Sequence, residues 1–148
     1  MLIYLDMCCF NRPFDDQSQV RIRFETEAKL LLQQHVREGR LALVWSYVLD
    51  YENSINPFAD RRESIKLWRS IAQTHVTETA RIVSKAKELT SFGIKAFDAL
   101  HVACAIAGNA AIFVSTDDTL LRKLRNSSEI QAILPGEALA QVENWYED

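Results

Sequence analysis

Four acidic residues in this sequence have the side chains and the placement needed to bind a divalent cation. They are Asp6, Glu52, Asp98 and Asp117. Four carboxylates in contact repel one another, by about 4 kcal/mol for a pair roughly 4 Å apart at an effective dielectric constant of about 20, so a positive charge must lie among them. Hard oxygen ligands without a His or Cys partner favour Mg²⁺ or Mn²⁺ over zinc, and these ions support phosphodiester hydrolysis. Taken singly, each acid is more simply explained as a helix cap or a surface carboxylate.

Short apolar runs predict the strands that would bring these acids together. The runs are Leu2 to Leu5, Leu41 to Trp45 and Ala111 to Val114. Asp6 directly follows the first run and Asp117 follows the third. Glu52 lies a turn or two beyond the second run, on a short helix for which Ser46 is the expected N-cap. Near-continuous apolar runs are typical of parallel strands covered on both faces, and open sheets of this kind bind ligands at the carboxyl edge.

Asp98 lies in the first turn of a predicted amphipathic helix. The apolar side chains of that helix are Phe97, Leu100, Cys104 and Ile106. Gly108 and Asn109 are expected to end it, directly before the apolar run from Ala111. The helix and the following strand therefore each carry one of the four acids at the end that would face the site.

The remaining elements are predicted from periodicity and turn signals. A helix is expected at Val20 to Val36, with Gly39 as its C-cap, and a second one around Ile65, Trp68 and Ile71. A third should follow a cap at Thr77, with Ala80, Val83 and Ala86 on its apolar face. A fourth is expected at Leu120 to Leu124. A last strand is expected at Ile130 to Leu134, then a turn at Pro135 and Gly136 and a C-terminal helix with Leu139, Val142 and Trp145. The segment Cys9 to Gln19 is expected to be a loop.

Strands that alternate with helices predict an α/β fold with a short-stranded parallel sheet between two helical layers, rich in helix. The strands that start near Leu2 and Ala111 should be adjacent and central, because both deliver acids to one site. A chain of 148 residues, 48% of them hydrophobic, is ordinary for a single domain, here residues 1–148. We find no internal repeat and no linker.

Composition narrows the possible settings of the protein. The net charge of -3 argues against a broadly basic nucleic-acid surface, although a local basic patch remains compatible with it. The three cysteines, Cys8, Cys9 and Cys104, support neither a disulfide framework nor a zinc site, so we expect reduced thiols in a cytoplasm. The N-terminus lacks a basic segment and its apolar run ends at Asp6, so we expect an unprocessed protein without a membrane span.

Taken in order, the acid-bearing segments resemble the four motifs of the PIN-domain nucleases, a family that includes the VapC-type toxins. The segments are LIYLD at Leu2 to Asp6, Ser46 with Glu52, FDALHVACA at Phe97 to Ala105, and FVSTDD at Phe113 to Asp118. The resemblance covers nearly the whole chain. It implies that Asp6, Glu52, Asp98 and Asp117 bind Mg²⁺ or Mn²⁺ at the carboxyl edge of the sheet and cleave RNA.

Two departures from the family pattern concern the first and fourth motifs. The family often has a small hydroxyl residue and then Asn after the first acid, whereas Met7 and Cys8 follow Asp6 here, so we expect a supporting contact to that acid to be lost. The fourth acid is either Asp117 or Asp118. We prefer Asp117 because it is closer to the strand end, and because Leu120 then takes the place of an apolar residue of the family.

Other polar residues near these motifs have simpler explanations. His101 is one turn after Asp98, but a helical histidine beside Leu100 is more often a packed residue, and we leave it outside the site. Arg12 is placed either to contact phosphate or to lie in a solvated loop. A cluster of basic residues, Arg122, Lys123 and Arg125, follows the fourth acid and would either track an RNA backbone or complement a helix C-terminus.

Three classes of function compete. The leading hypothesis is a metal-dependent endoribonuclease that cleaves RNA and is the toxin of a toxin-antitoxin pair. Its expected protein partner is an antitoxin. We also expect a homodimer formed through apolar surface near Trp68, Ile71 and Val83. The alternative is a non-catalytic PIN-like domain that binds nucleic acid or protein. A nucleotide-binding module is disfavoured because no glycine-rich phosphate loop is present, and an Asp-nucleophile phosphotransferase because Cys8 stands where its second Asp would be.

Overall fold

The computed structural model describes residues 1–147, and in them five parallel strands form one sheet. The strands are β1 (Leu2–Leu5), β2 (Ala42–Ser46), β3 (Thr74–Val76), β4 (Ile112–Val114) and β5 (Gln131–Ile133). Their order is β3-β2-β1-β4-β5, and every neighbouring pair is parallel. β1 is central and pairs with β4, Tyr4 opposite Phe113, which confirms the predicted adjacency of these two strands.

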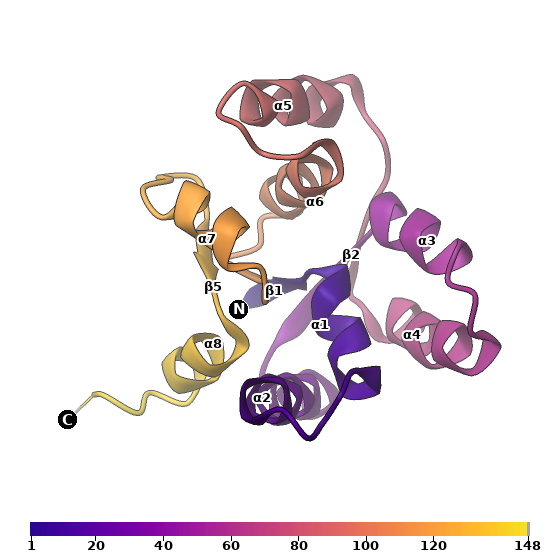
Figure 1. The fold of residues 1–148 in the computed structure, drawn as a ribbon. Helices are drawn as coiled ribbons and strands as arrows, with labels where there is room; N and C mark the ends of the chain where they lie inside the picture. The colour runs from indigo at the N-terminus through magenta and orange to yellow at the C-terminus, as the bar shows by residue number, and fades with distance from the viewer. Residues whose placement is uncertain (148) are drawn as a thin grey trace.

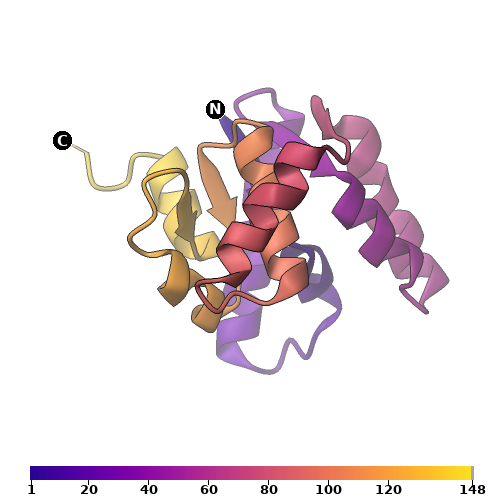
Figure 2. The same ribbon diagram turned by 90° about the horizontal axis from the view of Figure 1, so that it is seen from above.

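Helices cover both faces of the sheet and one side of it (Figure 1). They are α1 (Met7–Asn11), the 3-10 turn η1 (Arg12–Phe14), α2 (Val20–Arg37), α3 (Tyr47–Ser54), α4 (Ala59–Ile71), α5 (Ala80–Thr90), α6 (Ala96–Ala107), α7 (Asp118–Leu124) and α8 (Pro135–Val142). α2 packs against α8 on one face, and α5 packs against α6 on the other, where Figure 2 shows them lying across the sheet. α3 and α4 pack together beyond β2. The predicted three-layer α/β/α fold is confirmed.

The central strands form because their side chains are buried on both faces. Tyr4 and Phe113 are fully buried, and their rings stack with centroids 5.6 Å apart. The predicted end of α6 at Gly108 is confirmed, and the glycine is needed there for close packing. A Cβ at Gly108 would lie 2.6 Å from Cγ1 of Val44 and 3.0 Å from Cγ2 of Val76. This contact fixes α6 closely against β2.

The segment after β1 differs from the prediction of a loop. Asp6 caps α1 by accepting a hydrogen bond from the backbone nitrogen of Met7, and Pro13 lies in the first turn of η1. Met7, Cys9 and Phe10 are buried against the core. The loop prediction holds for residues 15–19 and was wrong for residues 9–14. It failed there because a cap and a few buried side chains hold these helices, which are too short to show periodicity.

Three further details differ at the outer elements. β3 was not predicted, because an edge strand of three residues, Thr74–Val76, has no apolar run. The N-cap of α5 is Thr79 and not Thr77: its side chain accepts from the backbone nitrogen of Ile82. α8 begins at Pro135 and ends at Val142, so Trp145 lies beyond it. Within residues 1–147, no helix has the length and apolar character of a membrane span.

Candidate active site

Asp6 is buried at the carboxyl end of β1, where both of its oxygens are held by the protein. Its side chain is the N-cap of α1, with Oδ1 accepting from the backbone nitrogen of Met7 at 2.8 Å. Oδ2 accepts a hydrogen bond from Oγ of Ser115 at 3.0 Å. Only 6% of the residue is exposed. Asp6 is therefore a fixed carboxylate at the edge of the sheet.

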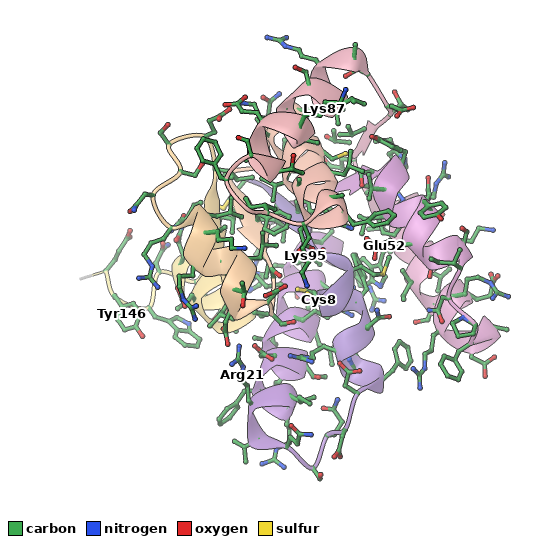
Figure 3. All side chains as sticks on the ribbon, turned by 45° about the horizontal axis from the view of Figure 1, so that its top comes forward. Cys8, Arg21, Glu52, Lys87, Lys95 and Tyr146 are labelled. Atoms are coloured by element: carbon green, nitrogen blue, oxygen red, sulfur yellow. The ribbon has the colours of Figure 1, made fainter. Side chains whose placement is uncertain are left out.

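Cys8 lies where the PIN motif has a polar side chain, and it remains in contact with the first acid. Its Sγ is 3.6 Å from Oδ2 of Asp6 and 3.4 Å from Oγ of Ser115. The expectation that a supporting contact would be lost was wrong, because Ser115 supplies a hydroxyl from β4's end and the thiol packs beside it. Figure 3 shows Cys8 on α1 and Glu52 on the neighbouring α3.

Ser115 also connects the first acid to the fourth. The buried hydroxyl that donates to Asp6 accepts a hydrogen bond from the backbone nitrogen of Asp117 at 3.2 Å. Asp117 is exposed and caps α7, its Oδ1 accepting from the backbone nitrogens of Thr119 and Leu120 at 3.0 and 3.2 Å. Sequence reasoning missed Ser115, although its place in the FVSTDD motif was a usable signal.

Asp118 has a different partner. Arg21 of α2 forms two hydrogen bonds with its carboxylate, at 2.7 and 2.8 Å, and Figure 3 shows Arg21 on that helix. This pair lowers the pKa of Asp118. The ion pair gives Asp118 a structural explanation that does not involve the other acids, so the geometry favours Asp117 as the fourth acid.

Glu52 is oriented by His101, a residue that sequence reasoning placed outside the site. As predicted, Ser46 caps α3, and its Oγ accepts from the backbone nitrogen of Leu49 at 3.2 Å. Nε2 of His101 is hydrogen-bonded to Oε1 of Glu52 and lies 3.8 Å from Oδ1 of Asp6. The exclusion of His101 was wrong: the ring is 99% buried, yet it contacts one acid and approaches another.

The other nitrogen of His101 belongs to a buried network. Nδ1 lies 2.6 Å from the hydroxyl of Tyr4, which lies 2.7 Å from Oγ of Ser46. With a neutral ring, Tyr4 donates to Nδ1. With a charged ring, Nδ1 donates to Tyr4, whose hydroxyl then donates to Ser46. The network satisfies His101 in either protonation state and fixes the direction of Nε2 towards Glu52.

The pKa of Asp98 shows that the four carboxylates share one electrostatic environment. Burial raises the pKa of this half-buried acid, and the negative charges of Asp6, Asp117 and Glu52 raise it further, while His101 lowers it. For His101, burial lowers the pKa, but the hydrogen bond to Glu52 and the charges of Asp6 and Asp98 outweigh burial, so the pKa is raised overall. The predicted acids and His101 therefore influence one another electrostatically.

Two observations bear on whether these residues fit a divalent cation. No Lys or Arg side chain in residues 1–147 forms an ion pair with any of the four acids, so His101 is their only ion-pair partner there. No three His, Cys, Asp or Glu side chains in the same residues are arranged as a ready metal cluster. The donor set of carboxylate oxygens fits Mg²⁺ or Mn²⁺. Asp117 is exposed and Asp98 is half-buried, so these two side chains are more accessible to a cation than buried Asp6.

The basic residues considered from the sequence differ in their surroundings. Arg12 is not free for a phosphate, because it forms ion pairs with Asp15 at 3.1 Å and Glu25 at 2.9 Å. Lys123 donates to the carbonyl of Gly93. Arg122 and Arg125 line a cavity of about 730 Å³ beside β5 and α7. Their contact with RNA stays a prediction.

Comparison with known proteins agrees with this geometry. The model of the PIN domain family matches residues 3–126, and the chain therefore belongs to the PIN domain family, whose members are generally nucleases. Its fold is similar to that of a chain in the crystal structure of VapBC2 from Rickettsia felis bound to a DNA fragment from their promoter. That likeness has a TM-score of 0.55 and 15% identity, over 90% of this chain and 98% of the other. No curated protein sequence matches.

Proposed function

We propose that the protein is a divalent-metal-dependent endoribonuclease and the toxin of a toxin-antitoxin pair. The observation that carries this proposal is the contact network that joins Asp6 to the backbone of Asp117 through Ser115, and Glu52 to His101, whose Nε2 lies 3.8 Å from Asp6. The charges of these three acids also raise the pKa of Asp98, and no Lys or Arg of residues 1–147 forms an ion pair with any of the four. Family membership supports nuclease chemistry. Asp6, Glu52, Asp98 and Asp117 are the proposed metal-binding and catalytic residues.

The chain's own residues divide the work at this site. Asp6 and Glu52 are the oriented acids, one held by Ser115 and the other by His101. Asp117 is exposed and Asp98 is half-buried, and these are the acids that we expect to adjust when a cation enters. Bound Mg²⁺ or Mn²⁺ would activate water and stabilise charge on the phosphate. His101 holds a proton between Glu52 and the Tyr4 hydroxyl, which keeps Glu52 in place as the charge at the site changes.

The proposed partners follow from the family and its structural neighbour. We infer RNA as the substrate and a cytoplasmic setting, which suits the three free cysteines. The neighbouring structure is of VapBC2 bound to DNA, which supports an antitoxin partner for this chain. A homodimer remains our expectation, and of the residues chosen for its surface Ile71 is 37% exposed, whereas Trp68 is only 7% exposed. Other exposed apolar side chains include Phe92 and Phe97.

The decisive experiment measures cleavage of a mixed RNA pool by the purified protein with Mg²⁺, with Mn²⁺ and with EDTA. We expect cleavage with either ion and none with EDTA. Asp98→Asn and Asp117→Asn should abolish cleavage, because each replaces a negatively charged carboxylate ligand of the cation by a neutral amide.

The matched control is Asp118→Asn, which changes the neighbouring carboxylate and breaks only the exposed pair with Arg21. It should keep most of the activity. Loss of activity in Asp118→Asn but not in Asp117→Asn would show that the fourth acid was wrongly assigned. RNA binding without cleavage under all metal conditions would favour a non-catalytic PIN-like domain.

A further inference from the structure

A second cavity lies between α1, η1, α2 and α4. Among the described residues, no Asp or Glu lines it. Its volume is about 390 Å³, within the usual range of small-ligand sites. We call it the Lys29 cavity. The residues that matter here are Phe10, Phe14, Lys29, Gln33, Arg37 and Trp68. None of the four acids of the proposed nuclease site lines it, so the cavity is distinct from that site.

One buried donor in the Lys29 cavity lacks an acceptor, and a largely buried cation lies one helical turn before it. Gln33 is 3% exposed, and its Nε2 has no hydrogen-bond partner among the described residues. Lys29 is 5% exposed, and the contact recorded for its ammonium group is with the Phe10 ring, 5.5 Å from the centroid. A buried amide without an acceptor is costly, and native proteins pair nearly all such groups. Gln33 therefore indicates an acceptor supplied from outside the described chain, and the charge of Lys29 favours an anionic one.

The spacing of the donors places them on one face of α2. Lys29, Gln33 and Arg37 follow one another at intervals of one helical turn, so their side chains project in the same direction. Arg37 stacks on Trp68, with its guanidinium carbon 4.8 Å from the ring centroid. Its charge also contributes to a lowered pKa of Lys29, for which burial is the larger cause. Two cations thus repel each other across a cavity that no Asp or Glu of the described residues lines.

The rest of the lining is apolar and aromatic. Phe10, Phe14 and Ile65 surround the buried donors together with Trp68. A bare inorganic anion would leave these surfaces uncovered. A carboxylate on an apolar body fits better, because its two oxygens would accept from the Gln33 amide and the Lys29 ammonium and its body would cover the rings.

We propose that the Lys29 cavity binds a carboxylate carried by an apolar or aromatic body, with Lys29 and Gln33 donating to the two oxygens and Trp68 contacting the body. The carboxylate belongs either to a free small acid or to an acidic side chain of a peptide. The chemistry of recognition is the same for both sources, and separate probes distinguish them.

The test uses isothermal titration calorimetry of the full chain with naphthylacetate and with its neutral amide, naphthylacetamide. A peptide arm compares acetyl-Phe-Glu-Phe-amide with the Gln counterpart. The indole N–H signal of Trp68 in NMR spectra reports the place of binding. We expect at least one acidic probe to bind saturably and shift that signal, about tenfold more tightly than its neutral partner. Preference for naphthylacetate identifies a free small acid, and preference for the Glu peptide identifies a peptide side chain.

Variants test the role of the donors. Lys29→Met and Gln33→Leu should each weaken binding of the acidic probe about tenfold. Without probe, each should raise the melting temperature, because Lys29→Met removes a cation that burial disfavours and Gln33→Leu removes a buried donor without a partner. Lys66→Met, an exposed change on α4 outside the cavity, should alter neither. Absence of saturable binding, equal binding of acid and amide, equally tight binding of inorganic phosphate, or unchanged affinity in both cavity variants would overturn the proposal.

Discussion

The hydroxyl of Ser115 donates to Oδ2 of Asp6 across 3.0 Å and accepts from the backbone nitrogen of Asp117 across 3.2 Å. One buried side chain at the end of β4 thus holds the acid that follows β1 and the backbone of the acid that follows β4. Because β1 and β4 are adjacent and parallel, this bridge spans two neighbouring strand ends. It sets the relative position of the first and fourth acids.

Replacing Ser115 by Ala should lower cleavage without unfolding the protein. The change removes one hydrogen bond to a buried carboxylate, which should reduce stability by about 1.5–3 kcal/mol. Urea unfolding and initial cleavage rates measure the two effects. Ser70→Ala, on the exposed face of α4, is the control and should alter neither. Unchanged cleavage in Ser115→Ala would contradict a positioning role for this hydroxyl.

Two tyrosine-to-phenylalanine changes should have different effects on stability. Tyr4→Phe leaves Nδ1 of His101 without its buried partner, and we expect a loss of about 1–3 kcal/mol. Tyr47→Phe removes a buried hydroxyl that has no hydrogen-bond partner among the described residues, so stability should stay the same or rise. Chemical denaturation compares them. Equal losses in the two variants would argue against a stabilising network around His101.

Asp98→Asn should weaken metal binding without lowering the stability of the metal-free protein. Burial and the neighbouring acids raise the pKa of Asp98, so its ionised form is disfavoured in the metal-free fold and the variant should be as stable as the wild type or more stable. A cation at one hundred times its Kd stabilises the folded wild type by about 2.7 kcal/mol. Thermal melts with and without Mn²⁺ should show a clear shift for the wild type and a much smaller one for the variant. Identical shifts would refute a shared cation.

The contribution of Lys29 to stability should depend on pH. Burial lowers the pKa of Lys29 from 10.5 to about 8 in the folded state. Below pH 8 both states are protonated and the folded state carries the full penalty, on the order of 3 kcal/mol. Between pH 8 and 10.5 the unfolded chain holds the extra proton, so folding becomes more favourable as pH rises. The advantage of Lys29→Met over wild type should therefore shrink across this range.

Urea unfolding at several pH values measures this difference. Comparing variant with wild type cancels the opposite trend from Tyr4 and Cys104, whose pKa values burial raises and which both proteins contain. Lys66→Met controls for the loss of a surface charge. If the stability advantage of Lys29→Met stays constant from pH 7 to about 10.5, burial does not lower the pKa of Lys29 in the folded state.

The sheet and its acids were predictable because their signals are local. An apolar run followed at once by a carboxylate indicates both a buried strand and the residue at its end, as for Asp6. The order of strands then follows from the requirement that β1 and β4 deliver acids to one place. The structure confirms this adjacency through the pairing of Leu5 with Val114.

The positioning residues were not predictable in the same way, because their partners are distant in sequence. His101 meets Tyr4 across 97 positions and Glu52 across 49. Beside Leu100 on a helix, a histidine has no pattern that separates packing from function. The short helices after β1 were missed for a related reason: the carboxylate of Asp6 was read as a ligand, although it also caps α1.

Three of the four acids lie at the N-terminus of a helix. Asp6 and Asp117 cap α1 and α7, and Asp98 lies in the first turn of α6, whereas Glu52 lies near the end of α3. The N-terminus of a helix carries a partial positive charge from its aligned peptide dipoles. Backbone therefore supplies part of the counter-charge that no Lys or Arg of residues 1–147 provides by ion pairing. Side-chain substitution does not remove this contribution, which helps to explain how four acids coexist in the metal-free fold.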